Sequence, residues 1–160
     1  MGWKRLHTGK FKPKNITKYK GNPAEIIYRS GLEHEFMKYL DRTPSVIKWS
    51  SEEIIVPYRS PIDGKRHRYF PDFWIRVKAA DGTISETLIE IKPKSQCSPP
   101  KGGPPIDRKK RRRYIKEVKT WGINEAKWKA AKSYCEIRNW HWKIITDHDL
   151  TKYQHGRTSK

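Results

Sequence analysis

Apolar side chains recur at helical spacing in two segments of the chain. The first segment begins at Ser30 and ends before Asp41, because the nearby Pro44 discourages continuation. The second begins at Asn124, a good N-cap residue, and stops near Asn139. We therefore predict two long helices. The apolar positions that define them are Leu32, Phe36, Tyr39 and Leu40, followed by Ala126, Ala130, Tyr134 and Ile137.

Four apolar runs predict β-strands. Three of them, residues 54–58, 67–78 and 87–92, lie between the helices and are separated by Asp-Gly turn signals. We expect the first two to form a hairpin and the third to complete three consecutive antiparallel strands. The last run, residues 142–145, follows the second helix and should lie parallel to a neighbour. The predicted fold is an α/β core of order αβββαβ, with a mixed central sheet flanked by helices.

Three segments lack this periodicity. Residues 1–22 are rich in Lys, Gly and Asn, and we predict a basic N-terminal arm that adds nothing to the core. Residues 93–113 form a proline-rich and basic loop inside a domain of residues 23–150. Residues 151–160 are a polar C-terminal tail that we expect to be frayed.

The charge balance indicates a polyanionic partner. The 160 residues include 36 Lys and Arg against 17 Asp and Glu, which gives a net charge of +19. The two cysteines, Cys97 and Cys135, suit neither a disulfide framework nor a zinc site. No stretch approaches the length of an apolar membrane span, so we expect no membrane partner. We also expect a polyanion, and not a small molecule, as the substrate.

Two carboxylates and a lysine fall on adjacent predicted strands. Side chains alternate faces along a strand, so Glu90 and Lys92 point the same way, about 6.7 Å apart along the strand axis. Ile91 faces the opposite side. Asp72 likewise opposes Phe73, so the sheet can bury its apolar residues while it presents Asp72 beside Glu90. Each residue taken singly would suit a solvated strand or turn, but the combination predicts a site.

The chemistry of that site follows from its charges. Carboxylates this close repel one another unless a cation neutralises them, and hard oxygen ligands suit Mg²⁺, with Mn²⁺ as a substitute. Such an ion activates water and neutralises charge on a scissile phosphate, while Lys92 would orient the nucleophile or stabilise the transition state. In a basic chain this predicts metal-dependent hydrolysis of a nucleic acid.

A fourth carboxylate on the first helix has two interpretations. Glu33 follows Ser30 at the spacing of a capping box, in which its carboxylate bonds to the start of the helix. Alternatively, it supports the metal or its water. Glu35, two positions further on, points to a different face of the helix from Glu33 and is the second choice for the metal role.

Several residues beyond the third strand are candidates for binding DNA. Lys94 and Gln96 lie just after the strand, where either could reach the site or remain solvated. The charge run favours phosphate contact over a localisation signal or simple solvation, and tryptophans such as Trp121 either stack on bases or fill the core. The run consists of Arg108, Lys109, Lys110, Arg111, Arg112 and Arg113.

The motifs together resemble known nucleases. Pro71-Asp72 with Glu90-Ile91-Lys92 resembles the PD-(D/E)xK superfamily, which implies a restriction-endonuclease-like fold. Most of residues 9–150 is similar to the head completion proteins of large tailed phages. The matching segments are Gly9-Lys10-Phe11-Lys12-Pro13-Lys14-Asn15, Ile27-Tyr28-Arg29-Ser30, Ser51-Glu52-Glu53-Ile54, His67-Arg68-Tyr69-Phe70-Pro71-Asp72-Phe73, Ile89-Glu90-Ile91-Lys92-Pro93-Lys94-Ser95-Gln96 and Trp121-Gly122-Ile123-Asn124-Glu125-Ala126-Lys127-Trp128.

That resemblance implies a nuclease that acts on double-stranded DNA after packaging, at the DNA end beside the portal and neck proteins. It implies a place in the virion, and in the host cytoplasm during assembly, and it assigns the catalytic and metal roles to Glu33, Asp72 and Glu90, with Lys92 as the catalytic lysine. Two alternatives stay open. One is a non-catalytic DNA-binding neck component that seals the genome. The other is a transposon end-cleaving endonuclease subunit, because such subunits resemble the same core.

Overall fold

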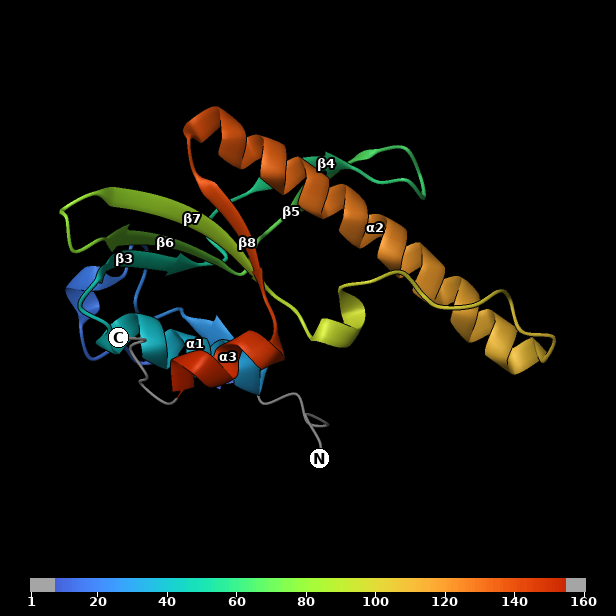
Figure 1. Cartoon of the computed structure of the whole chain (residues 1–160), viewed down its shortest axis with the longest axis horizontal. Coiled ribbons are helices and arrows are strands. Elements are labelled where there is room, and N and C mark those ends of the chain that lie inside the picture. Colours follow the sequence, from blue (N-terminus) through green and yellow to red (C-terminus); the bar gives the residue numbers. More distant parts are fainter. Residues whose placement is uncertain (1–7, 155–160) are drawn as a thin grey trace.

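The computed structural model describes the backbone of residues 8–154 and the side chains of residues 8–151. This part of the chain forms both helices and strands, with five successive strands after α1 (Figure 1). In order, the elements are β1 (Gly9–Lys10), η1 (Ile16–Lys18), β2 (Ile27–Tyr28), α1 (Gly31–Arg42), β3 (Val46–Ser51), β4 (Val56–Arg59), β5 (Arg66–Tyr69), β6 (Phe73–Lys78), β7 (Ile84–Ile91), η2 (Lys94–Gln96), α2 (Arg108–Arg138), β8 (His141–Ile145) and α3 (Asp147–Gln154).

The central sheet has four strands in the order β3-β6-β7-β8. β6 pairs antiparallel with both β3 and β7, and β8 pairs parallel with β7. The parallel pair is joined by α2, as expected for a crossover connection. The predicted mixed sheet flanked by helices is therefore confirmed. The core also has the order αβββαβ, but its first strand is β3 instead of the predicted run of residues 54–58, and β4 and β5 lie between β3 and β6 in the chain.

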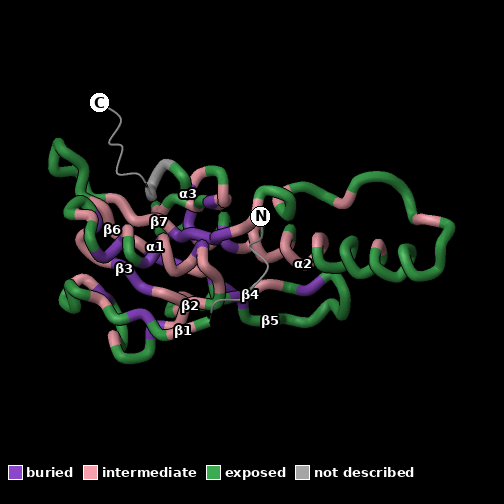
Figure 2. Tube along the Cα trace, turned by 90° about the horizontal axis from the view of Figure 1, so that it is seen from below, coloured by how far each residue is buried: buried purple, intermediate pink, exposed green. Residues whose placement is uncertain are grey.

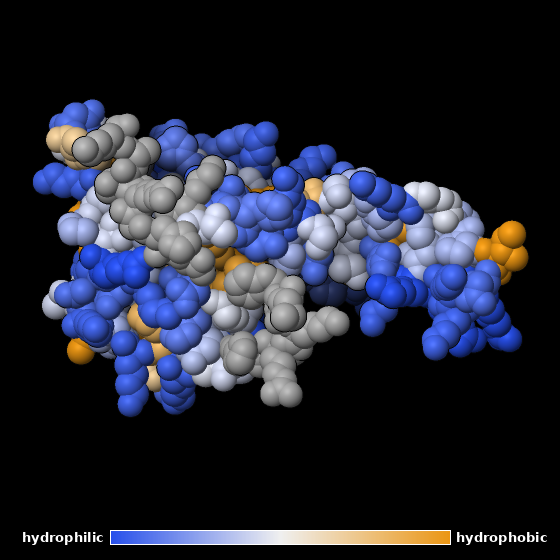
Figure 3. Space-filling model, turned by 60° about the horizontal axis from the view of Figure 1, so that its bottom comes forward, coloured by the Kyte–Doolittle hydropathy of each residue, from blue (hydrophilic) through white to orange (hydrophobic). Residues whose placement is uncertain are grey.

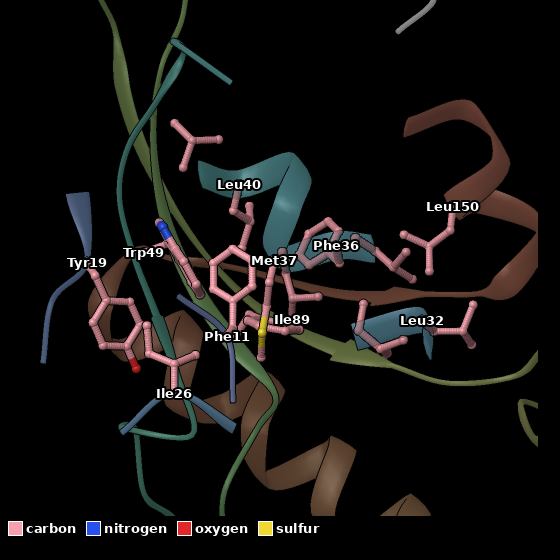
Figure 4. Close-up of a cluster of buried hydrophobic side chains, with 14 residues drawn as sticks. Phe11, Tyr19, Ile26, Leu32, Phe36, Met37, Leu40, Trp49, Ile89 and Leu150 are labelled. Atoms are coloured by element: carbon pink, nitrogen blue, oxygen red, sulfur yellow. The ribbon is translucent and has the colours of Figure 1, made fainter. Parts of the chain in front are cut away.

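Both faces of the sheet are covered, by different kinds of structure. α1 and α3 lie on one face, and α2 lies with the small β4–β5 sheet on the other (Figure 1). The core on the α1 side is large and aromatic, with Phe36, Trp49 and Phe73 almost fully buried. Figure 4 shows Phe36 and Trp49 in this cluster. The core on the α2 side is smaller and includes Trp74, Leu88 and Ala131. The site described below lies where these two layers meet.

α1 forms as its sequence predicts. Ser30 caps the helix by accepting a hydrogen bond from the Glu33 N–H at 3.1 Å, and the helix ends at Arg42, before Pro44. Leu32, Phe36, Met37 and Leu40 face the core, where each side chain stabilises the fold by about 1.5–3 kcal/mol through burial. The second predicted end near Asn139 is also confirmed, because Asn139 adopts the left-handed conformation after α2.

The expected hairpin between residues 54–58 and 67–78 is only partly present. β4 does pair with β5, but the second run breaks at Phe70-Pro71-Asp72, and β6 joins the central sheet instead. Proline cannot donate a ladder hydrogen bond, so it separates the two strands. The pairing of β6 with β7 across the Asp81-Gly82 turn is as predicted, with Gly82 at φ +86°. β3 was not predicted from the sequence.

α2 begins much earlier than expected. Residues 108–113, predicted as part of a loop, form its first turns, and Asp107 caps them by accepting the Lys110 N–H at 2.8 Å. Residues 108–120 are exposed except for the half-buried Tyr114, and they project beyond the sheet (Figures 1 and 2). We call residues 108–120 the projecting arm. Figure 3 shows that its surface is mainly hydrophilic.

The N-terminal segment is part of the fold, so the prediction of an arm without core residues is wrong for residues 8–22. β1 pairs with β2, and Phe11 and Tyr19 are buried in the main core. The segment is also tied to the end of α1, because Asp41 accepts the N–H groups of Lys14 and Asn15 at 2.9 and 3.1 Å. Residues 1–7 of the predicted arm lie outside the described residues.

The C-terminal boundary also differs from the prediction. Residues 151–154, expected to be frayed, belong to α3, and Leu150 of that helix is buried against α1. Residues 155–160 lie outside the described part of the chain. Within the described part, no helix combines the length and the apolar composition needed to cross a membrane.

Candidate active site

Asp72 lies between β5 and β6, at the point where the chain leaves the small sheet and enters the central one. Its side chain accepts the backbone N–H of Ile91 at 2.7 Å. Phe73 pairs with Ile89 in the sheet, so Asp72 lies beside Glu90 on the neighbouring strand. The break in the strand at Pro71 therefore shapes the site, because it leaves Asp72 outside the strand pairing. The Asp72 carboxylate can then reach across to the backbone at the end of β7.

Glu90 lies near the end of β7 and is only 8% exposed. The Tyr69 hydroxyl donates a hydrogen bond to one of its carboxylate oxygens. The other oxygen lies 3.8 Å from the Lys92 ammonium nitrogen. Ile89 and Ile91 point into the core on the α1 side, so strand alternation directs Glu90 towards the α2 side. The structure thus brings Asp72, Glu90 and Lys92 together, as predicted.

The two carboxylates are crowded electrostatically. Burial is the main cause that raises the pKa of Asp72 well above its usual value, and the Glu90 and Glu33 carboxylates add to the rise. Burial also raises the pKa of Glu90, although the hydrogen bond from Tyr69 and the nearby lysines oppose it. Ionisation of these two carboxylates is therefore unfavourable without a cation, and a bound cation would stabilise their charged forms.

Glu33 satisfies the capping interpretation and also faces the site. Its carboxylate accepts the Arg29 N–H at 3.1 Å and lies 3.2 Å from the Ser30 hydroxyl oxygen, which closes the capping arrangement. Burial raises the pKa of Glu33, and its charge in turn contributes to the raised pKa of Asp72. Its support of a metal stays a prediction. Glu35, the second choice, is paired instead with Lys38 at 2.6 Å.

The donor set fits some metals better than others. Among residues 8–151, no group of three or more His, Cys, Asp or Glu side chains is arranged to hold a metal ion. A structural zinc site would need such a group. Mg²⁺, however, is commonly held by one or two carboxylates together with water and substrate phosphates. Asp72 and Glu90, crowded and partly neutralised by Lys92, suit that arrangement.

One residue beside the candidate active site, Lys127, was not predicted from the sequence. Lys127 on α2 places its ammonium nitrogen 5.4 Å from the centre of the Tyr69 ring and 5.8 Å from that of Tyr58. Burial lowers its pKa, and the Glu90 and Asp72 carboxylates oppose that shift. A signal was present, because Lys127 precedes the buried Ala131 by four residues and so lies on the inward face of the helix.

Comparison with known proteins identifies the family. The sequence profile described as TnsA-like endonuclease N terminal matches residues 43–147. The chain belongs to this endonuclease family. It is also 40% identical over 144 residues to the head completion nuclease of Enterobacteria phage T4, an alignment that spans 90% of this chain and 93% of that protein. The resemblance to phage head completion nucleases and to transposon endonucleases is thereby confirmed.

The endonuclease match covers most of the candidate site. Asp72, Glu90, Lys92 and Lys127 all lie within residues 43–147, whereas Glu33 lies outside. The alignment with the phage nuclease is wider and extends over nine-tenths of the chain.

The residues predicted to bind DNA separate into two groups. Lys94, Gln96 and Arg113 line one cleft between η2 and α2. Arg108, Lys109, Lys110, Arg111 and Arg112 lie farther out, on the exposed first turns of α2. Their contact with DNA stays a prediction.

Proposed function

We propose that this protein is a metal-dependent deoxyribonuclease of a tailed phage, which acts during head completion on the end of the packaged double-stranded DNA. The observation that carries this proposal is the pair of crowded carboxylates, Asp72 and Glu90, with Lys92 beside them. Membership of an endonuclease family, and similarity to a head completion nuclease, support it. Portal and neck proteins would be its partners in the virion and in the host cytoplasm during assembly.

The roles of the residues follow from their contacts. When bound, Mg²⁺ would supply an activated water and neutralise charge on the scissile phosphate. Asp72 and Glu90 would hold it, each fixed in place by a donor, the Ile91 N–H and the Tyr69 hydroxyl respectively. Lys92 would orient the attacking water or the phosphate. Lys127 would approach the same phosphate from the α2 side.

A pair of matched substitutions tests the proposal. Asp72→Asn removes one charge from the site, and Asp63→Asn makes the same change in the exposed turn between β4 and β5. We expect the purified wild-type protein and the Asp63 variant to cleave DNA with Mg²⁺ or Mn²⁺, and not with chelator, whereas the Asp72 variant should bind DNA without cleaving it. Equal activity of the two variants, or cleavage in chelator, would contradict the proposal. Linear, circular and branched substrates in the same assay report the preferred DNA geometry.

A second candidate is a DNA-binding neck component without catalysis. The exposed cations of the projecting arm, which are remote in sequence from Asp72, favour it. Under that function, phage that carries Asp72→Asn would still produce infectious heads, and neutralisation of residues 108–113 would not. A transposon endonuclease, by contrast, would cleave only at defined DNA ends with a partner recombinase. Complementation with both variants separates these functions.

A further inference from the structure

A cleft separates the loop of residues 94–101 from one face of α2. It has a volume of 1020 Å³. The loop runs back along the helix (Figures 1 and 2) and is held there, because the Tyr114 hydroxyl donates to the Gly102 carbonyl at 3.1 Å. The cleft is therefore a feature of the folded chain, with one wall on the loop and one on α2.

The charge of the cleft is suited to a phosphate chain. Four cations line it, Lys94, Lys101, Arg113 and Lys116. Glu117 is the one carboxylate among the lining residues, and it is already paired with Arg113 at 3.0 Å. A groove with this excess of positive charge attracts a polyanion and releases counterions when it binds one.

The shape and the other side chains favour a single strand over a duplex. A volume of 1020 Å³ is at the upper end of the range for pockets that hold small molecules, about 300–1,000 Å³, and is too small for a double helix. Trp121, half-buried, lines the cleft and is braced edge-on by Trp128 at 5.7 Å between ring centres. A cationic groove with an aromatic platform is the usual arrangement for single-stranded nucleic acid.

Both walls of the cleft are close in sequence to residues of the candidate active site. Lys94 follows Lys92 by two residues on one wall. On the other wall, Arg113, Thr120 and Asn124 lie on the cleft face of α2, and Lys127 follows Asn124 by three residues. At 1.5 Å per residue, Arg113 and Lys127 are about 21 Å apart along the helix, a length that spans about six stacked nucleotides.

We propose that this cleft binds a short single-stranded segment at a DNA end and directs it to Asp72 and Glu90. The direction towards the carboxylates rests on the proposed nuclease function, whereas the binding itself does not. The preferred substrate is then a duplex with a single-stranded extension of up to about six nucleotides, instead of a blunt end.

The test compares two triple variants of equal charge. Lys94→Gln, Lys101→Gln and Lys116→Gln together neutralise the cleft, and Lys12→Gln, Lys78→Gln and Lys132→Gln remove three exposed lysines elsewhere. Fluorescence anisotropy in chelator measures the affinity of each protein for a blunt duplex and for the same duplex with a single-stranded extension. We expect the wild type and the control to prefer the extended duplex by about tenfold or more, and the cleft variant to lose that preference.

The outcomes distinguish this inference from the proposed function. No preference in the wild type, or an equal loss in both triple variants, overturns the cleft as a single-strand site even if Asp72→Asn abolishes cleavage. Conversely, a preference that only the cleft variant loses supports the inference even if cleavage is absent. In single-strand binding, the slope of log affinity against log salt should also fall by about 0.7 for each phosphate that the protein no longer neutralises, which is about 2 for three lysines.

Discussion

The candidate active site and the projecting arm differ in how their charges are placed. At the candidate active site, Glu90 is 8% exposed and sits among other titratable groups whose charges shift each other's pKa. On the projecting arm, the cations face water. Even the Arg113 side chain, which is paired with Glu117, is 84% exposed.

This difference determines how each region should respond to change. Charges in a buried cluster interact strongly because the surrounding medium screens them little, so removal of one alters the others. Exposed charges are screened by water and salt and contribute in small, nearly independent amounts. Removal of one charge from the cluster should therefore abolish most of its activity. Removal of charges from the projecting arm should weaken DNA binding in proportion to the number removed.

Two neighbouring lysines sharpen the comparison most. Lys92 lies 3.8 Å from the Glu90 carboxylate, and Lys94 lies two residues further on, at the wall of the cleft. We expect Lys92→Met to lower the single-turnover cleavage rate by about 10²- to 10³-fold with little change in DNA affinity. Lys94→Met should instead weaken binding a few-fold and leave the rate at saturating protein unchanged. If both variants show the same pattern, the active site and the cleft do not function separately.

The arm should respond to salt. Replacement of Arg108, Lys109, Lys110 and Arg112 by Gln removes four exposed charges while the helix-forming character is kept. The slope of log affinity against log salt should fall by about 0.9 for each duplex phosphate that is no longer neutralised, and affinity near physiological salt by about 10- to 100-fold. Cleavage by fully bound protein should stay at the wild-type rate. A matched loss of charge at Lys12, Lys78, Lys129 and Lys132 is the control.

Lys127 joins the two regions, because it lies on the same helix as the arm but reaches the cluster. Lys127→Met keeps the apolar stem over Tyr58 and Tyr69 and removes the charge near Glu90. We expect the cleavage rate to fall by about tenfold, and Lys127→Arg to restore part of it. Lys129→Met, an exposed neighbour on α2, should cleave at the wild-type rate. A loss of stability without a loss of rate would assign Lys127 a packing role only.

How much of the fold the sequence predicts depends on how local the signal is. Ser30, the apolar stripe of α1 and the Asp81-Gly82 turn are local, and each of these elements forms where expected. The charge run of α2 has no apolar periodicity and so suggested a loop. It is helical because Lys and Arg are good helix formers and the packed second half, with Ala131 and Cys135, supplies the nucleus from which the helix extends.

The candidate site likewise has features that local sequence signals predict and features that depend on tertiary packing. The convergence of Asp72, Glu90 and Lys92 follows from strand alternation and one pairing, both visible in the sequence. The exact break at Pro71, which moves β5 into a separate sheet, depends on tertiary pairing. Lys127 could not be placed, because its approach to Glu90 depends on how α2 crosses the sheet, 37 residues later in the chain.

The smallest expected effect concerns stability without metal. The native pKa of Asp72 is raised above its unfolded value of about 3.9, so the native state binds more protons than the unfolded state as pH rises past that value. Stability contributed by the protonated form is therefore present at low pH and lost as pH rises through the native pKa.

Asp72→Asn has no such proton to lose, so in chelator its melting temperature should exceed that of the wild type by about 2–4 °C at neutral pH, and by less near pH 4. Asp63→Asn, in an exposed turn, should show no gain at neutral pH. Added Mg²⁺ should then narrow the gap, because it stabilises only the protein whose carboxylates bind it. If the difference in melting temperature between Asp72→Asn and the wild type stayed constant with pH, the carboxylates would not be crowded. The charges of the site would then behave like those of the projecting arm, and the two regions would differ only in where they lie.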